Sequence, residues 1–292
     1  MTFKIIQNEN LYLKISPSMG ASIINFLEKN KNINIFRPLD NSKKINKYNS
    51  YFTGYFSTIP YFGNIREKSF YNYGKREYIS LQRTHILEPG TIHGEGWVNK
   101  WKVNKLTTSS IELYFNHKGK KGFSCSYKST QKFKLIKNSL IISISIENLD
   151  EHSFDCGIGF HPWFNIDKNS KIYSNSFNCL EKKKSNNFNK IKYSNKKFLD
   201  LNINKIDKTF LNWNGKSKLI INNDVSLNII NGKNVKNLHV YSPPKEDFFC
   251  IEPVTNITDA YYLKKIGRKD HGLITLQPNR IFKAVCEFKV II

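Results

Sequence analysis

The chain has 292 residues, of which 39% are hydrophobic and 14% aromatic, and its net charge is +23. This much apolar material offsets the ordering entropy that keeps polar chains disordered, so we expect a folded protein, with one domain over residues 1–292. The charge raises the question of a nucleic-acid partner. The lysines, however, are spread from Lys4 to Lys289 rather than gathered in a stripe. We therefore expect no nucleic-acid partner.

The first residues lack the apolar stretch of a signal peptide, and no apolar run approaches the roughly 20 residues that span a bilayer. The five cysteines are odd in number, widely spaced and never arranged as C-x-x-C. This spacing argues against a disulfide framework and a structural zinc site. We expect a cytoplasmic protein with free thiols, no membrane partner and no metal.

Alternation of apolar and polar residues is the dominant pattern along the chain. It recurs over residues 111–115, 142–146 and 282–290. A period of two indicates half-buried strands. Turn-forming segments rich in Asn and Gly separate such runs, at 116–122, 212–215 and 231–232. With no long helical pattern and no repeat, the sequence predicts an all-β fold, a large antiparallel β-sandwich.

The most polar stretch covers residues 181–197 and is rich in Lys, Asn and Ser. Such a composition is also found in linkers between domains. An apolar segment, 198–201, follows it without any wider shift in composition. We therefore predict a long surface loop within a single domain.

His93 is the first candidate functional residue, because Gly94 and Gly96 leave the backbone around it accessible and Trp97 lies close by. A glycine-rich turn with a surface histidine explains the segment about as well.

His161 is the second candidate, in the segment Gly157–Asn165. Pro162 favours an extended backbone at His161, so we expect the histidine at the end of a strand. Histidine titrates near neutral pH, and an oriented one can act as a general acid or base. The alternative is a histidine that only packs within an aromatic cluster.

Glu252 follows four apolar residues, 248–251, and precedes Pro253. Burial would raise the pKa of this carboxyl toward the range useful for proton abstraction, whereas a nearby cation would lower it. The alternative is an acid that turns out to solvent. Asp207 is a weaker candidate, since an aspartate in a turn usually caps the local backbone.

The motifs of several common chemistries are absent: the sequence has no P-loop, no G-x-G-x-x-G, no G-x-S-x-G and no H-E-x-x-H. We therefore expect no cofactor. Two histidines, an acid or two and many aromatic residues suit proton transfer on a polyhydroxylated substrate that stacks on rings in an open cleft. A sugar fits that description.

In this order, the segments around His93, His161 and Glu252 resemble the aldose 1-epimerase (galactose mutarotase) family. Its members carry an H-G segment, an H-P-aromatic-F segment and a late glutamate. The resemblance covers nearly the whole chain, since residues 16–22 and 282–290 also look like the opening and closing strands of the family. It implies a large antiparallel β-sandwich.

The resemblance also implies roles for individual residues. Glu252 would be the general base at the anomeric hydroxyl, and His161 the general acid at the ring oxygen. His93 would bind the sugar and polarise its ring oxygen, and Asp207 would bind the sugar.

One departure concerns the arginine with which the family contacts the sugar. Asn64 stands at its position, and Arg66, two residues on, shares a strand face with it and is a rough substitute. A second departure is Trp163, where the family usually has tyrosine. These differences affect the expected substrate more than the expected fold.

The sequence leaves three functions open. The first is a mutarotase of free aldohexoses such as galactose or glucose, acting as a monomer or homodimer. The second is an epimerase of hexose 6-phosphates, for which Arg66, Arg76 and Arg83 could supply phosphate contacts. The third is a non-catalytic module that binds carbohydrate or, through its charge, nucleic acid.

Overall fold

The structure, a computed structural model, describes residues 3–40, 49–65, 69–80, 91–119, 123–182, 188–202 and 205–292. Within these ranges the regular secondary structure is almost entirely β-strand, with one α-helix, α1 (Ala260–Lys265), and two 3-10 turns, η1 (Asn49–Phe52) and η2 (Gly96–Val98). The strands form two large antiparallel sheets. The predicted all-β sandwich is therefore confirmed.

The larger sheet contains eleven of the described strands, in the order β1-β2-β3-β5-β15-β24-β23-β20-β17-β18, with β4 beside β3. Its strands are β1 (Lys4–Gln7), β2 (Leu11–Ser16), β3 (Ser22–Glu28), β4 (Ile33–Asn34), β5 (Tyr55–Thr58), β15 (Gly159–Asn165), β17 (Asn178–Lys182), β18 (Phe188–Lys192), β20 (Ile206–Leu211), β23 (Asn237–Ser242) and β24 (Phe248–Val254). Strands β5, β15, β24 and β23 lie at its centre, although they come from distant parts of the chain. This order decides which side chains meet.

The smaller sheet contains nine described strands, in the order β10-β11-β12-β13-β26-β22-β21-β16-β19. Its strands are β10 (Lys102–Leu106), β11 (Ser110–Lys118), β12 (Ser126–Ile136), β13 (Ser139–Asn148), β16 (Lys171–Ser174), β19 (Phe198–Asp200), β21 (Lys216–Ile220), β22 (Ser226–Asn231) and β26 (Ile281–Ile291). The three segments for which alternation predicted strands lie in β11, β13 and β26.

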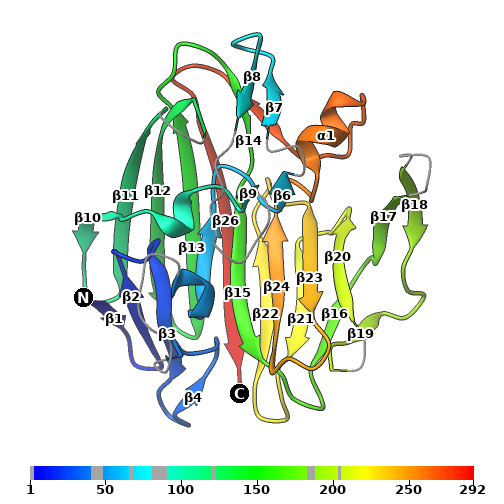
Figure 1. Cartoon of the computed structure of the whole chain (residues 1–292). Helices are drawn as coiled ribbons and strands as arrows, with labels where there is room; N and C mark the ends of the chain where they lie inside the picture. The colour runs from blue at the N-terminus through cyan, green and yellow to red at the C-terminus, as the bar shows by residue number, and fades with distance from the viewer. Residues whose placement is uncertain are drawn as a thin grey trace.

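Three short antiparallel pairs complete the described strands. They are β6 (Asn64–Ile65) with β9 (Thr91–Ile92), β7 (Ser69–Asn72) with β8 (Glu77–Ser80), and β14 (Phe154–Cys156) with β25 (Ile274–Leu276). The β7–β8 hairpin and α1 lie together at the upper end in Figure 1. No helix in the described part of the chain is long and apolar enough to cross a membrane.

The main hydrophobic core lies between the two large sheets. Phe36, in the segment after β4, shows this most directly, because its ring meets Phe164 of the larger sheet at 5.3 Å and Phe288 of the smaller sheet at 5.4 Å. On β13, Ile142 and Ile144 are fully buried in the same core. The period of two seen in the sequence is thus the pleat of strands that turn one face to this core.

The prediction of a long surface loop over residues 181–197 is wrong for residues 181–182 and 188–192, and residues 183–187 lie outside the described residues. Residues 188–192 form β18, which pairs with β17, so that Cys179 faces Ile191 and Leu180 faces Lys190. The pair ends the larger sheet, where half of its residues are exposed to solvent and all but one of the others are partly exposed. Lysines on an edge strand discourage pairing with another chain, so a polar composition suits such a strand as well as a loop.

We predict that Ile142→Ala destabilises the protein by about 2–5 kcal/mol, because it leaves a cavity between two packed sheets. The check is the free energy of unfolding from urea denaturation. Ser143→Ala, on the opposite face of the same strand, is the matched control and is expected to change stability by less than about 0.5 kcal/mol. Equal effects of the two substitutions would contradict the assignment of the core face.

Candidate functional site

Strand β15 divides its side chains between two environments. Phe160 and Phe164 point into the main core, while Trp163 belongs to a separate aromatic cluster. Successive residues of a strand face opposite sides, so His161 shares the face of Trp163. The strand is buried on both faces, which its continuous apolar sequence allows.

Strand β24, next to β15, repeats this division. Phe249 and Ile251 lie in the main core, and Phe248 and Cys250 lie in the separate cluster. Glu252 continues the alternation on the face of Cys250. Register places Cys250 opposite Trp163 on β15. The face of the larger sheet that is turned away from the main core, called here the site face, therefore carries His161, Cys250 and Glu252.

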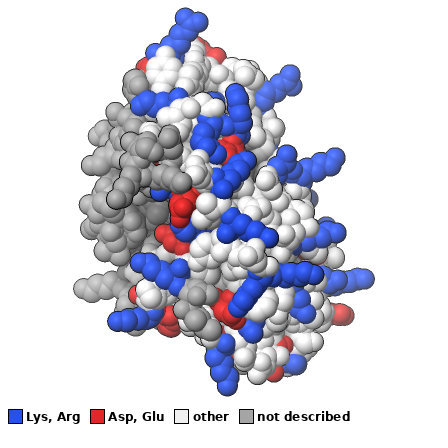
Figure 2. All heavy atoms as spheres, turned by 90° about the vertical axis from the view of Figure 1, so that its right-hand side faces the viewer, with Lys and Arg blue, Asp and Glu red and all other residues white. Residues whose placement is uncertain are grey.

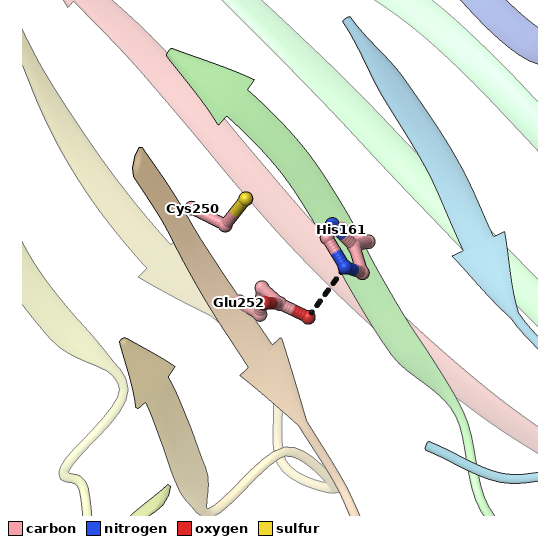
Figure 3. Close-up of side chains that lie close together, drawn as sticks. All are labelled: His161, Cys250 and Glu252. Atoms are coloured by element: carbon pink, nitrogen blue, oxygen red, sulfur yellow. Dashed lines mark ion pairs between the residues drawn. The ribbon is translucent and has the colours of Figure 1, made fainter. Parts of the chain in front are cut away.

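His161 and Glu252 project toward one another across the two strands (Figure 3). The Nε2 atom of His161 lies 3.3 Å from Oε2 of Glu252, and their side chains are only 6% and 2% exposed. The sequence predicted His161 at a strand end, and this is wrong, because it is the third residue of β15. Proline tolerates this extended backbone, and the pair is brought together inside the sheet.

Burial favours the uncharged form of both His161 and Glu252. Desolvation raises the pKa of Glu252 well above its usual range, and the negative charge of Asp207 adds to the effect. Desolvation lowers the pKa of His161 well below its usual range, and His93, His239 and Arg37 add to it. The favoured state is thus a protonated carboxyl beside a neutral imidazole.

His93 approaches the pair from a separate loop. Its ring lies 4.9 Å from that of His161, edge to face. The Gly63 N–H donates to Nδ1 of His93 at 3.2 Å, and the His93 N–H donates to the Gly63 carbonyl at 2.9 Å. Since Nδ1 accepts this hydrogen bond, the neutral ring carries its own proton on Nε2. His93 is in this way oriented by backbone contacts.

The backbone of this loop is tightly constrained. Gly94 has a φ of +64°, and a Cβ there would lie 2.1 Å from the carbonyl oxygen of Ile59. That carbonyl accepts hydrogen bonds from the N–H groups of Glu95 at 2.7 Å and Gly96 at 3.0 Å. Only glycine fits this contact, which explains the H-G sequence.

Asn64 is adjacent to this loop and pairs with Ile92. Its side-chain Oδ1 is buried and has no hydrogen-bond partner among the described residues. An unpaired amide oxygen next to His93 is available to a ligand hydroxyl. Arg66, the other residue predicted for this role, lies outside the described residues.

Asp207 reaches the pair through a residue that the sequence analysis missed. His239, on β23, faces Glu252 in the register and places Nε2 3.5 Å from Oδ1 of Asp207. Burial lowers the pKa of His239 to about 4. Thr209 lies 2.9 Å from the other ring nitrogen. With a side chain 68% exposed, Asp207 marks the open end of the site.

Arg37 is a second residue that the sequence gave no reason to select. Its guanidinium carbon lies 4.2 Å from the ring centre of Trp163 and 4.9 Å from that of Phe248. One nitrogen donates to the Tyr51 carbonyl at 3.0 Å. Buried Nε has no hydrogen-bond partner in the described part of the chain. The site face thus carries a guanidinium, which comes from the segment after β4 instead of from Arg66.

Aromatic rings surround the two histidines. Trp163 stacks on His161 with ring centres 5.2 Å apart and planes at 17°, and Phe56 lies 4.3 Å from His161. Phe62 lies 5.3 Å from His93 and 5.0 Å from His239. These three rings are themselves buried, so they shield the two histidines and Glu252 from solvent.

Many of the described Lys and Arg side chains lie away from the site face. In Figure 2, Lys and Arg side chains are scattered over the face that carries the β17–β18 edge, with Asp and Glu among them. An open depression of 530 Å³ on the smaller sheet shares no residue with the site face; its lining includes Lys197, Lys216, Lys218 and Asn228. No charged stripe connects either feature to the acid–base pair among the described residues.

Comparison with known proteins assigns the chain to one family. A sequence model described as aldose 1-epimerase matches residues 2–289. The uncharacterized protein YphB of Escherichia coli K12 is 26% identical over 117 residues, which make up 40% of this chain and 39% of that protein. The aligned stretch is thus less than half of that relative.

Solved structures match over nearly the full length. A galactose mutarotase-like protein from Clostridium acetobutylicum has a TM-score of 0.83 at 18% identity, covering 100% of this chain and 98% of that one. Another, from Lactobacillus casei, has a TM-score of 0.79 at 15% identity, covering 99% and 100%. At these identities the likeness is one of fold.

We predict that Gly94→Ala destabilises the protein by about 1–3 kcal/mol, because alanine is strained at this positive φ and its Cβ meets the Ile59 carbonyl. It should also shift the imidazole NMR signals of His93. Gly232→Ala is the control, since a Cβ there meets its nearest atom at an ordinary 3.5 Å. Unchanged stability and unchanged His93 signals in Gly94→Ala would refute the constraint.

Proposed function

Because the chain belongs to the aldose 1-epimerase family, we propose that it interconverts the α and β anomers of a free aldohexose, such as galactose or glucose. The observation that carries this proposal is the buried contact between His161 and Glu252, 3.3 Å apart. Mutarotation needs one group to remove a proton from the anomeric hydroxyl while another delivers a proton to the ring oxygen. The pair offers both groups at one place.

The proton count of the pair suits this reaction. A protonated Glu252 beside a neutral His161 holds one proton, as does a Glu252 carboxylate beside a His161 imidazolium. The two states differ only in which atom holds that proton, so no proton need enter from solvent. Burial favours the neutral state, and a bound sugar would favour the charged one by donating to the carboxylate and accepting from the imidazolium.

In the proposed reaction, Glu252 takes the proton of the anomeric hydroxyl and His161 gives its proton to the ring oxygen. The bond between C1 and the ring oxygen breaks, and C1 becomes the carbonyl carbon of the open chain. Rotation about the C1–C2 bond presents the other carbonyl face. The ring closes with the two residues in exchanged roles, and the site returns to its starting proton count.

Other residues of the site are proposed to hold the sugar. His93 would donate a hydrogen bond from Nε2 to the ring oxygen of the sugar. Its contact with Gly63 leaves the imidazole proton on Nε2 for this purpose. Asp207 would accept a hydrogen bond from a sugar hydroxyl at the open end of the site. Asn64 would accept one from a sugar hydroxyl through its buried Oδ1. Arg37 is proposed in the role of the family arginine.

We favour a free sugar over a hexose 6-phosphate. Arg37 is the cation that acts on His161, and it is already engaged with two rings and the Tyr51 carbonyl. A phosphate dianion is usually held by several donors. Of the other arginines considered for this role, Arg76 lies in the turn between β7 and β8, and Arg66 and Arg83 lie outside the described residues.

We place the reaction in the cytoplasm, a compartment that suits five free, buried cysteines.

We predict that Glu252→Gln lowers the enzymatic rate of galactose and glucose mutarotation by about 10²–10⁴-fold, because the amide cannot take the anomeric proton. Polarimetry of freshly dissolved α anomers measures the rate. Glu147→Gln, an acid on β13 of the other sheet, is the matched control and should retain the wild-type rate. Faster turnover of glucose 6-phosphate than of glucose would reverse the choice of substrate. A wild-type protein without activity on any of these sugars would refute the function.

The pH profile of kcat/KM, which reports the sugar-free protein, should be bell-shaped, because one proton must remain on the pair. The acid limb, where His161 takes up a second proton, should lie below 6.5, since its pKa is lowered from that value. The alkaline limb, where Glu252 loses its proton, should lie well above the ordinary 4.5 of a glutamate.

The charge of Asp207 gives a test of this assignment. Asp207 raises the pKa of Glu252, so Asp207→Asn should lower that pKa and move the alkaline limb to lower pH. Because the Asp207 side chain is 68% exposed, solvent screens it, and we expect a shift of less than about one pH unit. Asp224→Asn, at an exposed turn, is the control. An alkaline limb that moves upward would contradict the proton count.

A further inference from the structure

Cys250 is a buried thiol on the site face for which the proposed reaction has no use. Its side chain is fully buried, and it lies two residues before Glu252 on β24, so both project from the same face (Figure 3). The Sγ of Cys250, a ring nitrogen of His161 and a carboxylate oxygen of Glu252 all lie within 4.8 Å of one another. No other group of three such side chains this close occurs among the described residues.

The three donor types are those that Zn²⁺ prefers: a thiolate, an imidazole and a carboxylate. In a tetrahedral zinc site with bonds of about 2.0–2.3 Å, neighbouring ligand atoms lie about 3.3–3.6 Å apart. The 3.3 Å between Nε2 of His161 and Oε2 of Glu252 already matches that spacing. From within 4.8 Å, the sulfur has to approach by at most about 1.5 Å to complete the face of a tetrahedron.

We propose that His161, Cys250 and Glu252 form an inhibitory binding site for Zn²⁺. Three protein ligands leave the fourth tetrahedral position to a water molecule, as in zinc sites that remain open on one side. The ion would use the same lone pairs that the proposed reaction needs on Glu252 and His161. Zinc and a reacting sugar therefore exclude one another. The proposal of zinc binding depends only on the geometry of the three side chains, whereas the proposal of inhibition rests on the proposed function.

The proton balance follows from the state of the three groups. Burial raises the pKa of the Cys250 thiol well above its usual range, so the free site holds the thiol proton. It also holds the single proton shared by His161 and Glu252. Zinc takes a thiolate, a neutral imidazole and a carboxylate, and its binding therefore releases two protons to solvent. Affinity should fall steeply as the pH is lowered.

The nearby positive charge works against the ion and sets a limit on affinity. Arg37 acts electrostatically on both Cys250 and His161. The ligands contribute one thiolate and one carboxylate, so the bound metal and Arg37 together carry more positive charge than the site neutralises. We therefore expect reversible binding that a chelator removes, in contrast to a structural zinc.

The test uses the full-length protein freed of metal by a chelator. Co²⁺ serves as the optical probe, because a thiolate ligand gives a charge-transfer band that histidine and carboxylate ligands do not. Zinc titration by calorimetry in two buffers of different ionisation enthalpy gives the affinity and the number of protons released. We expect a cobalt–thiolate band that zinc abolishes, and two protons per zinc.

Variants assign the ligands. Cys250→Ser, Cys250→Ala and Glu252→Gln should each weaken zinc binding by more than about 100-fold, since even loss of a ligand's hydrogen-bond partner costs about 10–100-fold. Cys179→Ser is the matched control, a buried cysteine on β17 outside the cluster. Circular dichroism checks that each variant is folded. A cobalt–thiolate band that is absent from the wild type, or that persists in Cys250→Ala, overturns the site.

Polarimetry separates the two proposals. The ratio of mutarotation rates with and without zinc should fall in the wild type and in Cys179→Ser, and galactose should protect against zinc. If the wild type is active but indifferent to zinc, the inhibitory site is wrong and the proposed function stands. If it binds zinc through Cys250 but has no mutarotase activity without metal, the proposed function is wrong and the metal site stands.

Discussion

The contact between His161 and Glu252 is the interaction on which the proposed chemistry of this site depends. Two ionisable groups are placed in a desolvated environment, where each by itself would be driven to its neutral form. Side by side they share one proton, and moving it between them changes no net charge. A single buried pair is therefore able to act as acid and base in turn, and the aromatic rings around it protect this arrangement from water.

The pair exists because β15 and β24 are adjacent in the larger sheet and are covered on both faces. One face of each strand supplies the main core with Phe160, Phe164, Phe249 and Ile251. The opposite face is thereby free for His161 and Glu252, held at a fixed separation by the register. Alternate residues of the same two strands pack in the main core and form the proposed acid–base pair. A substitution on the core face therefore affects the position of the side chains on the site face.

Much of this could be predicted from the sequence, and the reasons for the remainder are physical. Alternation predicted β11, β13 and β26, because a strand with one buried face carries its period in its composition. Residues 188–192 were assigned to a loop, because an exposed edge strand is as polar as a loop. His161 was expected at a strand end because Pro162 favours an extended backbone before it, but this preference is met equally well inside β15, where Pro162 lies.

Arg37 and His239 could not be found from local sequence, because nothing near either residue resembles a site. Arg37 reaches Trp163 and Phe248 only through the packing of the segment after β4 against the centre of the sheet. His239 reaches Glu252 through the pairing of β23 with β24. Both deliver positive charge or a polarisable ring to the same pair, and Arg37 also acts on Cys250. The electrostatic environment of the pair thus depends on the strand order and on the packing of the segment after β4. Both decide how strongly the pair holds its proton in the proposed reaction and how readily the proposed zinc ion would replace it.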